Sequence, residues 1–182
     1  MENELDNLED QSLFNSSGPV EKPKRMDTLN IMKSPEIIDM LNDGESLVWS
    51  GEMYKINKNK RRQTRRFFMT NRRFFNIGQE AFLNKLINVF KKGKCKRSIN
   101  LYDIESVTFS LTSEEFTIHV PKDYDYRLQS PDRNIFLSSL LYYRDKILED
   151  PVKFYPVEDF DLKKYTRYDK KDKVVTPKCQ PC

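Results

Sequence analysis

Alternating apolar and polar residues in the middle of the chain constrain its fold more than any other feature. In residues 46–56, SLVWSGEMYKI, four residues fall on one side of an extended strand: Leu47, Trp49, Gly51 and Met53. Similar short patterns recur at 65–70, 73–78, 97–101, 104–110 and 115–120. Short strands that follow one another through turns are typical of an antiparallel sheet.

A helical pattern follows the last of these strands. Residues 121–130 are mostly polar and are expected to form a loop, after which Pro131 suits the first turn of a helix. The apolar residues of the predicted helix are Ile135, Leu137, Leu140, Leu141, Ile147 and Leu148. Strands followed by one amphipathic helix predict a mainly β fold with α, in which the helix covers one side or end of the sheet.

The segments on either side of this predicted domain, 46–148, differ from it in composition. Residues 1–34 form an acidic leader with little periodicity, which we expect to be disordered or ordered by a partner. Residues 35–45 contain a short predicted helix, because Pro35 suits a first helical turn. Residues 149–182 are polar and basic and predict an extended tail.

Composition argues against several classes of protein. Three cysteines, with no even disulfide framework and no secretory signal, favour a reducing compartment and a cytoplasmic location. No apolar run approaches the roughly 20 residues of a membrane-spanning helix, so membrane contact is expected at the surface only. The single histidine, His119, cannot by itself supply a hydrolase triad or a histidine-based metal site. We therefore predict a protein that is not an enzyme and uses no cofactor or metal.

Positive charge is concentrated in one part of the chain. The net charge is only +4, but residues 55–97 contain fifteen Lys and Arg and one acid, Glu80. That stretch therefore carries +14 and the remainder −10, which predicts a basic face for an anionic partner. Anionic lipid, nucleic acid, and a protein-binding surface or solvated strand edge are the three alternatives. Nucleic acid is disfavoured because Phe67 and Met69 fall on one strand face, in the pattern of core residues. No strand then displays two aromatic side chains on one exposed face, which base stacking would require.

Several short motifs occur in an order that resembles a known type of domain. They are YKIN (54–57), RRFFMTN (65–71), KRSI (96–99), LYDI (101–104), FTIHV (116–120) and DYDYR (123–127). Together they resemble the PH-like tail homology domain of class I myosins. They are also similar to the PH-like domain that precedes the catalytic domain in some protist AGC-type kinases. The resemblance covers 46–148 and implies a bent antiparallel barrel of six or seven strands, capped at one open end by a C-terminal helix.

The resemblance also implies where a lipid headgroup would bind, at the mouth formed by the first two strands and their loop. Lys55 shares a strand face with Trp49 and Met53, and Arg65 shares one with Phe67, so both should point into the mouth. Lys and Arg match the dense negative charge of an inositol phosphate. The other predicted lipid-binding residues are Lys58, Lys60, Arg61, Arg62 and Arg66.

Residues 81–90, AFLNKLINVF, interrupt the strand patterns. Phe82, Leu86 and Phe90 fall on one side of a predicted helix, and the basic KKGKCKR follows it. One hypothesis is a membrane-insertion segment that lies in the bilayer interface. The other is that the same three side chains cover the barrel.

Two cysteines end the sequence as Cys179-Gln180-Pro181-Cys182. A redox pair would need a helix start or another basic environment beside the thiols, where the tail offers only Lys178, and a metal site would need more ligands. Cys179 is the fourth residue from the end, where prenylation occurs, and upstream lysines would supply a second membrane signal. Gln180 and Pro181 are not the aliphatic residues of such a signal, so an unmodified tail is the alternative.

Three functional hypotheses follow. The first is a non-enzymatic PH-like module that binds anionic phospholipid, of the phosphoinositide type, and is recruited to a membrane or a membrane–cytoskeleton surface. The second is a structural adaptor whose barrel and tails bind proteins in a cytoskeletal or other large assembly. The third is a degenerate kinase relative, because 161–173 looks similar to the link that follows the PH-like domain in those kinases.

Overall fold

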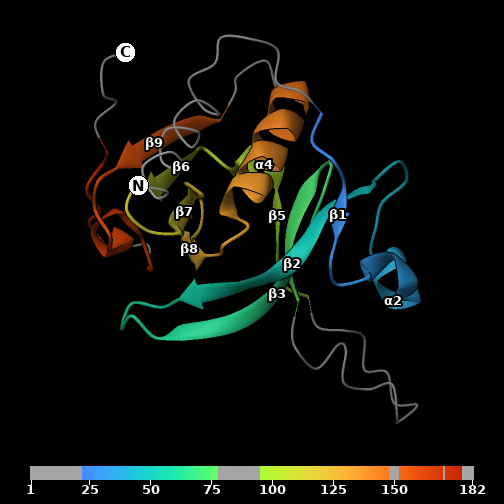
Figure 1. Cartoon of the computed structure of the whole chain (residues 1–182), viewed down its shortest axis with the longest axis horizontal. Coiled ribbons are helices and arrows are strands. Elements are labelled where there is room, and N and C mark those ends of the chain that lie inside the picture. Colours follow the sequence, from blue (N-terminus) through green and yellow to red (C-terminus); the bar gives the residue numbers. More distant parts are fainter. Residues whose placement is uncertain (1–21, 78–94, 148–151, 170, 178–182) are drawn as a thin grey trace, which may run out of the picture.

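The computed structural model describes residues 22–77, 95–147, 152–169 and 171–177 (Figure 1). The strands are β1 (Met26–Asp27), β2 (Leu47–Ile56), β3 (Arg62–Thr70), β4 (Arg73–Ile77), β5 (Cys95–Asn100), β6 (Ser106–Ser110), β7 (Glu115–His119), β8 (Tyr126–Gln129) and β9 (Lys153–Val157). The α-helices are α2 (Pro35–Ile38) and α4 (Arg133–Ile147). Three 3-10 turns are η1 (Ile31–Lys33), η3 (Leu101–Asp103) and η4 (Leu162–Tyr165).

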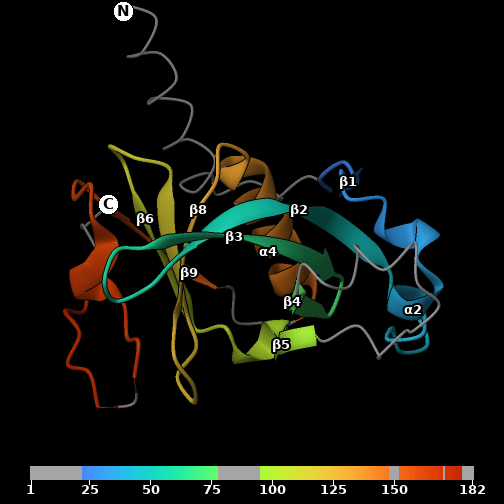
Figure 2. The same cartoon turned by 90° about the horizontal axis from the view of Figure 1, so that it is seen from below.

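One curled sheet contains all of these strands. Its order is β5-β4-β3-β2-β8-β7-β6-β9, and β1 pairs with β2 outside this path. Strands β2 to β5 form one antiparallel meander and β6 to β8 another, and short antiparallel pairing of β2 with β8 joins them. Helix α4 lies in the angle between the two meanders (Figures 1 and 2). The expected mainly β architecture, with a helix after the strands, is therefore confirmed.

Aromatic side chains fill the space between the sheet and the helix. Trp49 and Phe136 of α4 are fully buried and meet edge to face, with ring centroids 5.1 Å apart. Gly51 is required beside them, because a Cβ at this position would lie 2.6 Å from the Trp49 ring.

In β2, β3 and β4, Trp49, Met53, Phe67 and Phe74 lie on the interior face as the alternation predicts. Leu47 does not, because the register shifts between Leu47 and Trp49, which places Leu47 in the outer cluster and Val48 in the interior.

The paired phenylalanines of β3 and β4 show that this part of the sheet is buried on both faces. Phe67 stacks on Phe74 in the interior, with centroids 5.2 Å apart. Phe68 stacks on Phe75 at 4.3 Å in a second apolar cluster on the outer face. Ile31 and other N-terminal residues cover that outer cluster.

The N-terminal leader therefore contributes to the sheet where the structure describes it. Strand β1 pairs in parallel with β2, Met26 opposite Trp49. Asp27 fixes this segment, because its Oδ1 accepts hydrogen bonds from Ser50 Oγ at 2.6 Å and from the Ile31 amide at 2.9 Å. The short helix expected within 35–45 is limited to α2, and turns follow it.

Two segments that were expected to be irregular contain strands. Residues 121–130 were expected to form a loop, but they include β8. Tyr126 and Leu128 face the interior, and Arg127 between them is buried on the other face of the strand, so β8 does alternate, but with only two apolar residues. The expected tail includes β9, which pairs in parallel with β6 from Ser106↔Lys153 to Ser110↔Val157.

We call residues 152–169 and 171–177 the C-terminal strap. After β9 the strap turns through η4, where Leu162 and Tyr165 are buried. It crosses the side of the domain that carries β6, β7 and β9, opposite α2 (Figure 1).

Some predictions fall on residues that the structure does not describe. They include the predicted helix at 81–90 with Phe82, Leu86 and Phe90, and the candidate lipidation site Cys179. Within the described ranges, no helix is long and apolar enough to cross a membrane.

Candidate functional site

The basic residues near the β2–β3 hairpin fall into two groups. Four of them, Lys55, Arg65, Lys96 and Arg97, come from strands β2, β3 and β5, and we call them the cationic cluster. Lys58 and Lys60 lie in the β2–β3 loop and contact the C-terminal strap instead. The predicted site is therefore divided, and the two parts differ in how far their charges are neutralised.

Two tyrosines hold the cationic cluster together. Lys55 Nζ lies 5.1 Å from the ring centroid of Tyr124 and 5.0 Å from that of Tyr126. The Arg97 guanidinium lies over the same rings, at 4.0 and 4.7 Å. Cation–π attraction therefore offsets part of the repulsion between Lys55 and Arg97.

Arg97 retains capacity to donate hydrogen bonds. Only 9% of its side chain is exposed, and its Nη2 lies 2.9 Å from a carboxylate oxygen of Asp123. The orientation is poor for a hydrogen bond, and neither Nη1 nor Nη2 has a hydrogen-bond partner among the described residues. A buried guanidinium with unused donors is costly without a ligand, so Arg97 is suited to bind an anion.

The electrostatics of Lys55 show that positive charge is in excess here. Burial lowers the pKa of the Lys55 ammonium, and the charges of Arg97, Arg65 and Lys96 lower it further. Arg65 is half-buried, and its guanidinium donates to Gln63 Oε1 at 2.9 Å, a neutral partner. The carboxylate of Asp123 balances only part of this charge.

The loop lysines, in contrast, are paired with acids of the strap. Lys58 Nζ lies 2.7 Å from Asp172 Oδ1, which raises the pKa of Lys58 and lowers that of Asp172. Lys60 pairs with Asp161. Lys60 also adopts a left-handed backbone conformation, with φ of 60°, which closes the turn.

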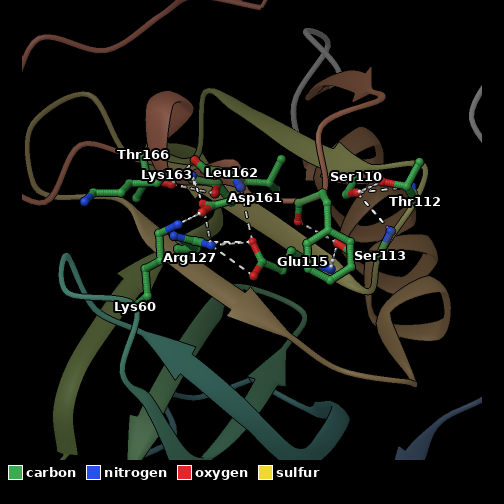
Figure 3. Close-up of polar contacts among 12 residues, drawn as sticks. Lys60, Ser110, Thr112, Ser113, Glu115, Arg127, Asp161, Leu162, Lys163 and Thr166 are labelled. Atoms are coloured by element: carbon green, nitrogen blue, oxygen red, sulfur yellow. Dashed lines mark hydrogen bonds and ion pairs between the residues drawn. The ribbon is translucent and has the colours of Figure 1, made fainter.

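Asp161 belongs to a buried ionic network that anchors the strap (Figure 3). Arg127 of β8 donates through Nε and Nη2 to both carboxylate oxygens of Glu115 on β7, at 2.7–3.0 Å. Asp161 Oδ1 lies 2.8 Å from Arg127 Nη2, and the Leu162 amide donates to Glu115. The side chains of Arg127 and Glu115 are only 2% and 5% exposed, so this network is part of the fold.

A hollow of about 500 Å³ lies between the β2–β3 loop and the strap. It is lined by Lys58, Asp161, Lys163, Lys164, Thr166, Tyr168, Asp172 and Lys173. Its lysines outnumber its acids, but Lys58 is held by Asp172, and Lys164 lies 2.9 Å from Asp159. Because these charges are partly neutralised within the protein, the cationic cluster is the stronger candidate for an anion site.

The remaining predicted residues lie outside the cluster. Arg66 is on the opposite face of β3 and donates to Glu52 at 2.9 Å. Arg61 and Arg62 are exposed where β3 begins. The sequence analysis did not predict Arg97 as a lipid-binding residue. Arg97 shares a strand face with Ile99, and a basic residue on the apolar face of a strand is the same signal that identified Lys55 and Arg65.

His119 has a structural role. Its Nε2 lies 2.7 Å from Thr108 Oγ1 and its Nδ1 lies 3.1 Å from Asp125 Oδ2. Asp125 also accepts from the backbone amide of Arg167, so the histidine helps to join the β7–β8 loop to the strap.

Comparison with solved structures shows the fold alone. The hSac2 domain from human phosphoinositide phosphatase Sac2 superposes with a TM-score of 0.51 at 11% sequence identity, covering 83% of this chain and 92% of that chain. The linker-DH/PH domains of p115-RhoGEF give a TM-score of 0.44 at 11% identity, covering 80% of this chain and 42% of that chain. No curated protein sequence matches the chain.

Comparison with protein families is more informative. The family described as "Unconventional myosin tail, actin- and lipid-binding" matches residues 24–180. This range takes in β1, the whole curled sheet and the C-terminal strap. It confirms the resemblance to the myosin tail homology domain that the short motifs indicated. The chain therefore belongs to the family of unconventional myosin tails, which are actin- and lipid-binding domains.

Proposed function

We propose that the cationic cluster binds the phosphates of an anionic lipid headgroup, of the phosphoinositide type, and thereby recruits the domain to a membrane. The observation that carries this proposal is that the buried guanidinium of Arg97 has N–H groups without a hydrogen-bond partner among the described residues. Arg97 lies beside Lys55, and burial together with cationic neighbours lowers the pKa of Lys55. Cationic side chains that are held close together repel one another and lower the stability of the fold, and a bound polyanion would offset this repulsion.

Geometry supports specific roles within the cluster. Arg97 is held by Tyr124 and Tyr126 and would present a fixed guanidinium to one phosphate. Lys55 and Arg65 occupy neighbouring strands, with Met53 opposite Arg65 and Lys55 opposite Gln63, and would contact a second phosphate. Lys58 and Lys60 would contribute a weaker, longer-range attraction, because each already pairs with an acid.

Vesicle binding tests this proposal. The double variant Lys55→Ala/Arg65→Ala should lose about tenfold or more in affinity for phosphatidylcholine vesicles that contain a phosphoinositide. Vesicles with phosphatidylserine at the same surface charge separate headgroup recognition from general attraction. The matched control is Arg66→Ala/Arg72→Ala, which removes the same charge from the outer face of β3 and from the β3–β4 turn. Equal affinities of the two double variants would show that the cluster is not the binding site.

Actin binding is a second candidate function, because the family description includes it. It narrows the hypothesis of a structural adaptor to a cytoskeletal filament. Sedimentation of the chain with filamentous actin in the absence of lipid tests it directly. Binding that survives Lys55→Ala/Arg65→Ala would place actin on another surface, and lack of sedimentation would argue against this function.

A further inference from the structure

The guanidinium of Arg97 is shielded from solvent in the free protein. Its Nη1 and Nη2 atoms are buried and have no hydrogen-bond partner among the described residues, so an anion can reach them only if a neighbouring group moves. One such neighbour is Asp123 in the β7–β8 loop, whose Oδ2 lies 2.9 Å from Arg97 Nη2. The Asp123 side chain is 45% exposed and that of Arg97 only 9%, so the carboxylate is the part of this pair that solvent reaches.

The contact between Arg97 and Asp123 is a poor one compared with another ion pair of this chain. Arg127 donates three hydrogen bonds of 2.7–3.0 Å to the carboxylate of Glu115. Arg97 approaches Asp123 as closely, but the orientation gives no hydrogen bond from Nη1 or Nη2. A phosphate carries more oxygens and more charge than a carboxylate, and it can accept from both nitrogens together. A phosphate is therefore the better partner for Arg97.

The backbone of Asp123 is held in place, so only its side chain has to turn. Arg167 of the strap donates through Nη2 to the Asp123 carbonyl at 2.8 Å. The Asp123 amide donates to the Val120 carbonyl at 3.0 Å, and the Tyr124 amide donates to Asp123 Oδ1 at 2.8 Å. These bonds keep the carboxylate beside Arg97 when no ligand is bound.

We propose that Asp123 is an internal competitor of the ligand, whose carboxylate occupies the place beside Arg97 that a phosphate of the lipid headgroup takes on binding. In the free protein Asp123 offsets part of the repulsion among the cations of the cluster. In the complex its side chain turns to solvent and the phosphate replaces it. This inference rests on the proposed function, because it concerns the same ligand, and it adds the residue that limits the affinity of the site.

Calorimetric titration of the full chain with soluble inositol trisphosphate tests the inference. Asp123→Asn should bind this ligand about fivefold more tightly than the wild type, because the charge is lost while an acceptor for the Tyr124 amide remains. The matched control is Asp39→Asn, which removes the same charge from the exposed C-terminal end of α2. Its affinity should change by less than about twofold, because salt screens a distant charge. Thermal unfolding verifies that each variant is folded.

A second background tests whether Asp123 acts through Arg97. Arg97→Met removes the guanidinium and keeps an unbranched side chain near the rings of Tyr124 and Tyr126. Phosphoinositide vesicles at low ionic strength serve as the ligand, because the other cations of the cluster still attract them. Asp123→Asn should raise vesicle affinity about fivefold in the wild type and less than about twofold in Arg97→Met. An equal gain in both backgrounds would show general repulsion and overturn the competition.

Failure of this inference differs from failure of the proposed function. If the wild type binds inositol trisphosphate and Asp123→Asn binds it no more tightly, the competition is overturned and headgroup recognition stands. If neither protein binds it, both proposals are overturned. A gain in Asp39→Asn equal to that in Asp123→Asn would also overturn the competition, because net charge alone would then explain the result.

Discussion

At the scale of single residues, Lys55 illustrates a conflict between binding and stability. Its stem is half-buried near Tyr124 and Tyr126, and its charge faces other cations. Because burial and these cations lower its pKa, the folded state favours the neutral amine more than the unfolded state does. The charge of Lys55 therefore opposes folding at neutral pH, as expected of a residue that serves a ligand.

Lys55→Met should stabilise the domain and weaken lipid binding. Methionine keeps the apolar stem and removes the charge, so the gain should be up to about 1 kcal/mol at neutral pH. The gain should shrink as pH rises through the lowered pKa of folded Lys55 towards the ordinary value of 10.5, because the folded wild type then loses its charge. Thermal unfolding of both proteins over this pH range measures the difference. A less stable variant would show that cation–π attraction dominates and that Lys55 is structural.

At the scale of elements, one buried ion pair lies at the contact between β7, β8 and the strap. Arg127 and Glu115 bind each other through several hydrogen bonds, and Asp161 and Tyr168 of the strap both contact Arg127. Removal of one partner would leave an uncompensated charge in the interior, which costs far more than the loss of a surface pair. The same pair positions Asp161 to hold Lys60.

Arg127→Met should lower the free energy of unfolding by about 3–5 kcal/mol, as measured by urea denaturation. Arg66→Ala, which breaks the more exposed pair with Glu52, should cost no more than about 1 kcal/mol. Arg127→Met/Glu115→Leu should recover part of the loss, because no buried charge is then left unpaired. Equal effects of Arg127→Met and Arg66→Ala would mean that the strap does not depend on this network.

At the scale of the whole molecule, the folded unit extends beyond the segment with strand patterns. Ile31 covers the outer face of β3 and β4, and Leu162 is buried at the other side of the domain. Both lie outside residues 46–148. Their removal would expose apolar surface on two sides of the sheet and leave β6 as an uncovered edge.

A fragment of residues 46–148 should therefore unfold at a much lower temperature than the full chain, or fail to fold cooperatively. A fragment of residues 22–177 should retain most of the stability. Circular dichroism during heating compares the three proteins. A fragment 46–148 that melts cooperatively at the temperature of the full chain would show that β1 and the strap are dispensable.

The sequence by itself determined most of the strands, the capping helix and the direction of individual side chains. Alternation along a strand assigns each residue to one face, and this pattern alone predicts that Lys55 and Arg65 lie on the interior side. The same rule places Arg127 of β8 on the face opposite Tyr126 and Leu128, but it does not show that this charged side chain is buried, because its partner Glu115 comes from another strand. It also cannot recognise β9, whose residues gain their partners from β6.

Only the tertiary structure decided which charges act together. Lys58 and Asp172 are 114 residues apart in sequence, and no local pattern could show that they pair. The curl of the sheet likewise brings Arg97 of β5 to the tyrosines beside Lys55. The physical reason is that periodicity encodes the face on which a side chain lies, whereas an ion pair or a shared anion site depends on distances set by chain folding. The basic stretch thus indicated an anionic partner, and the fold divided its residues between the ligand, the strap and the surface.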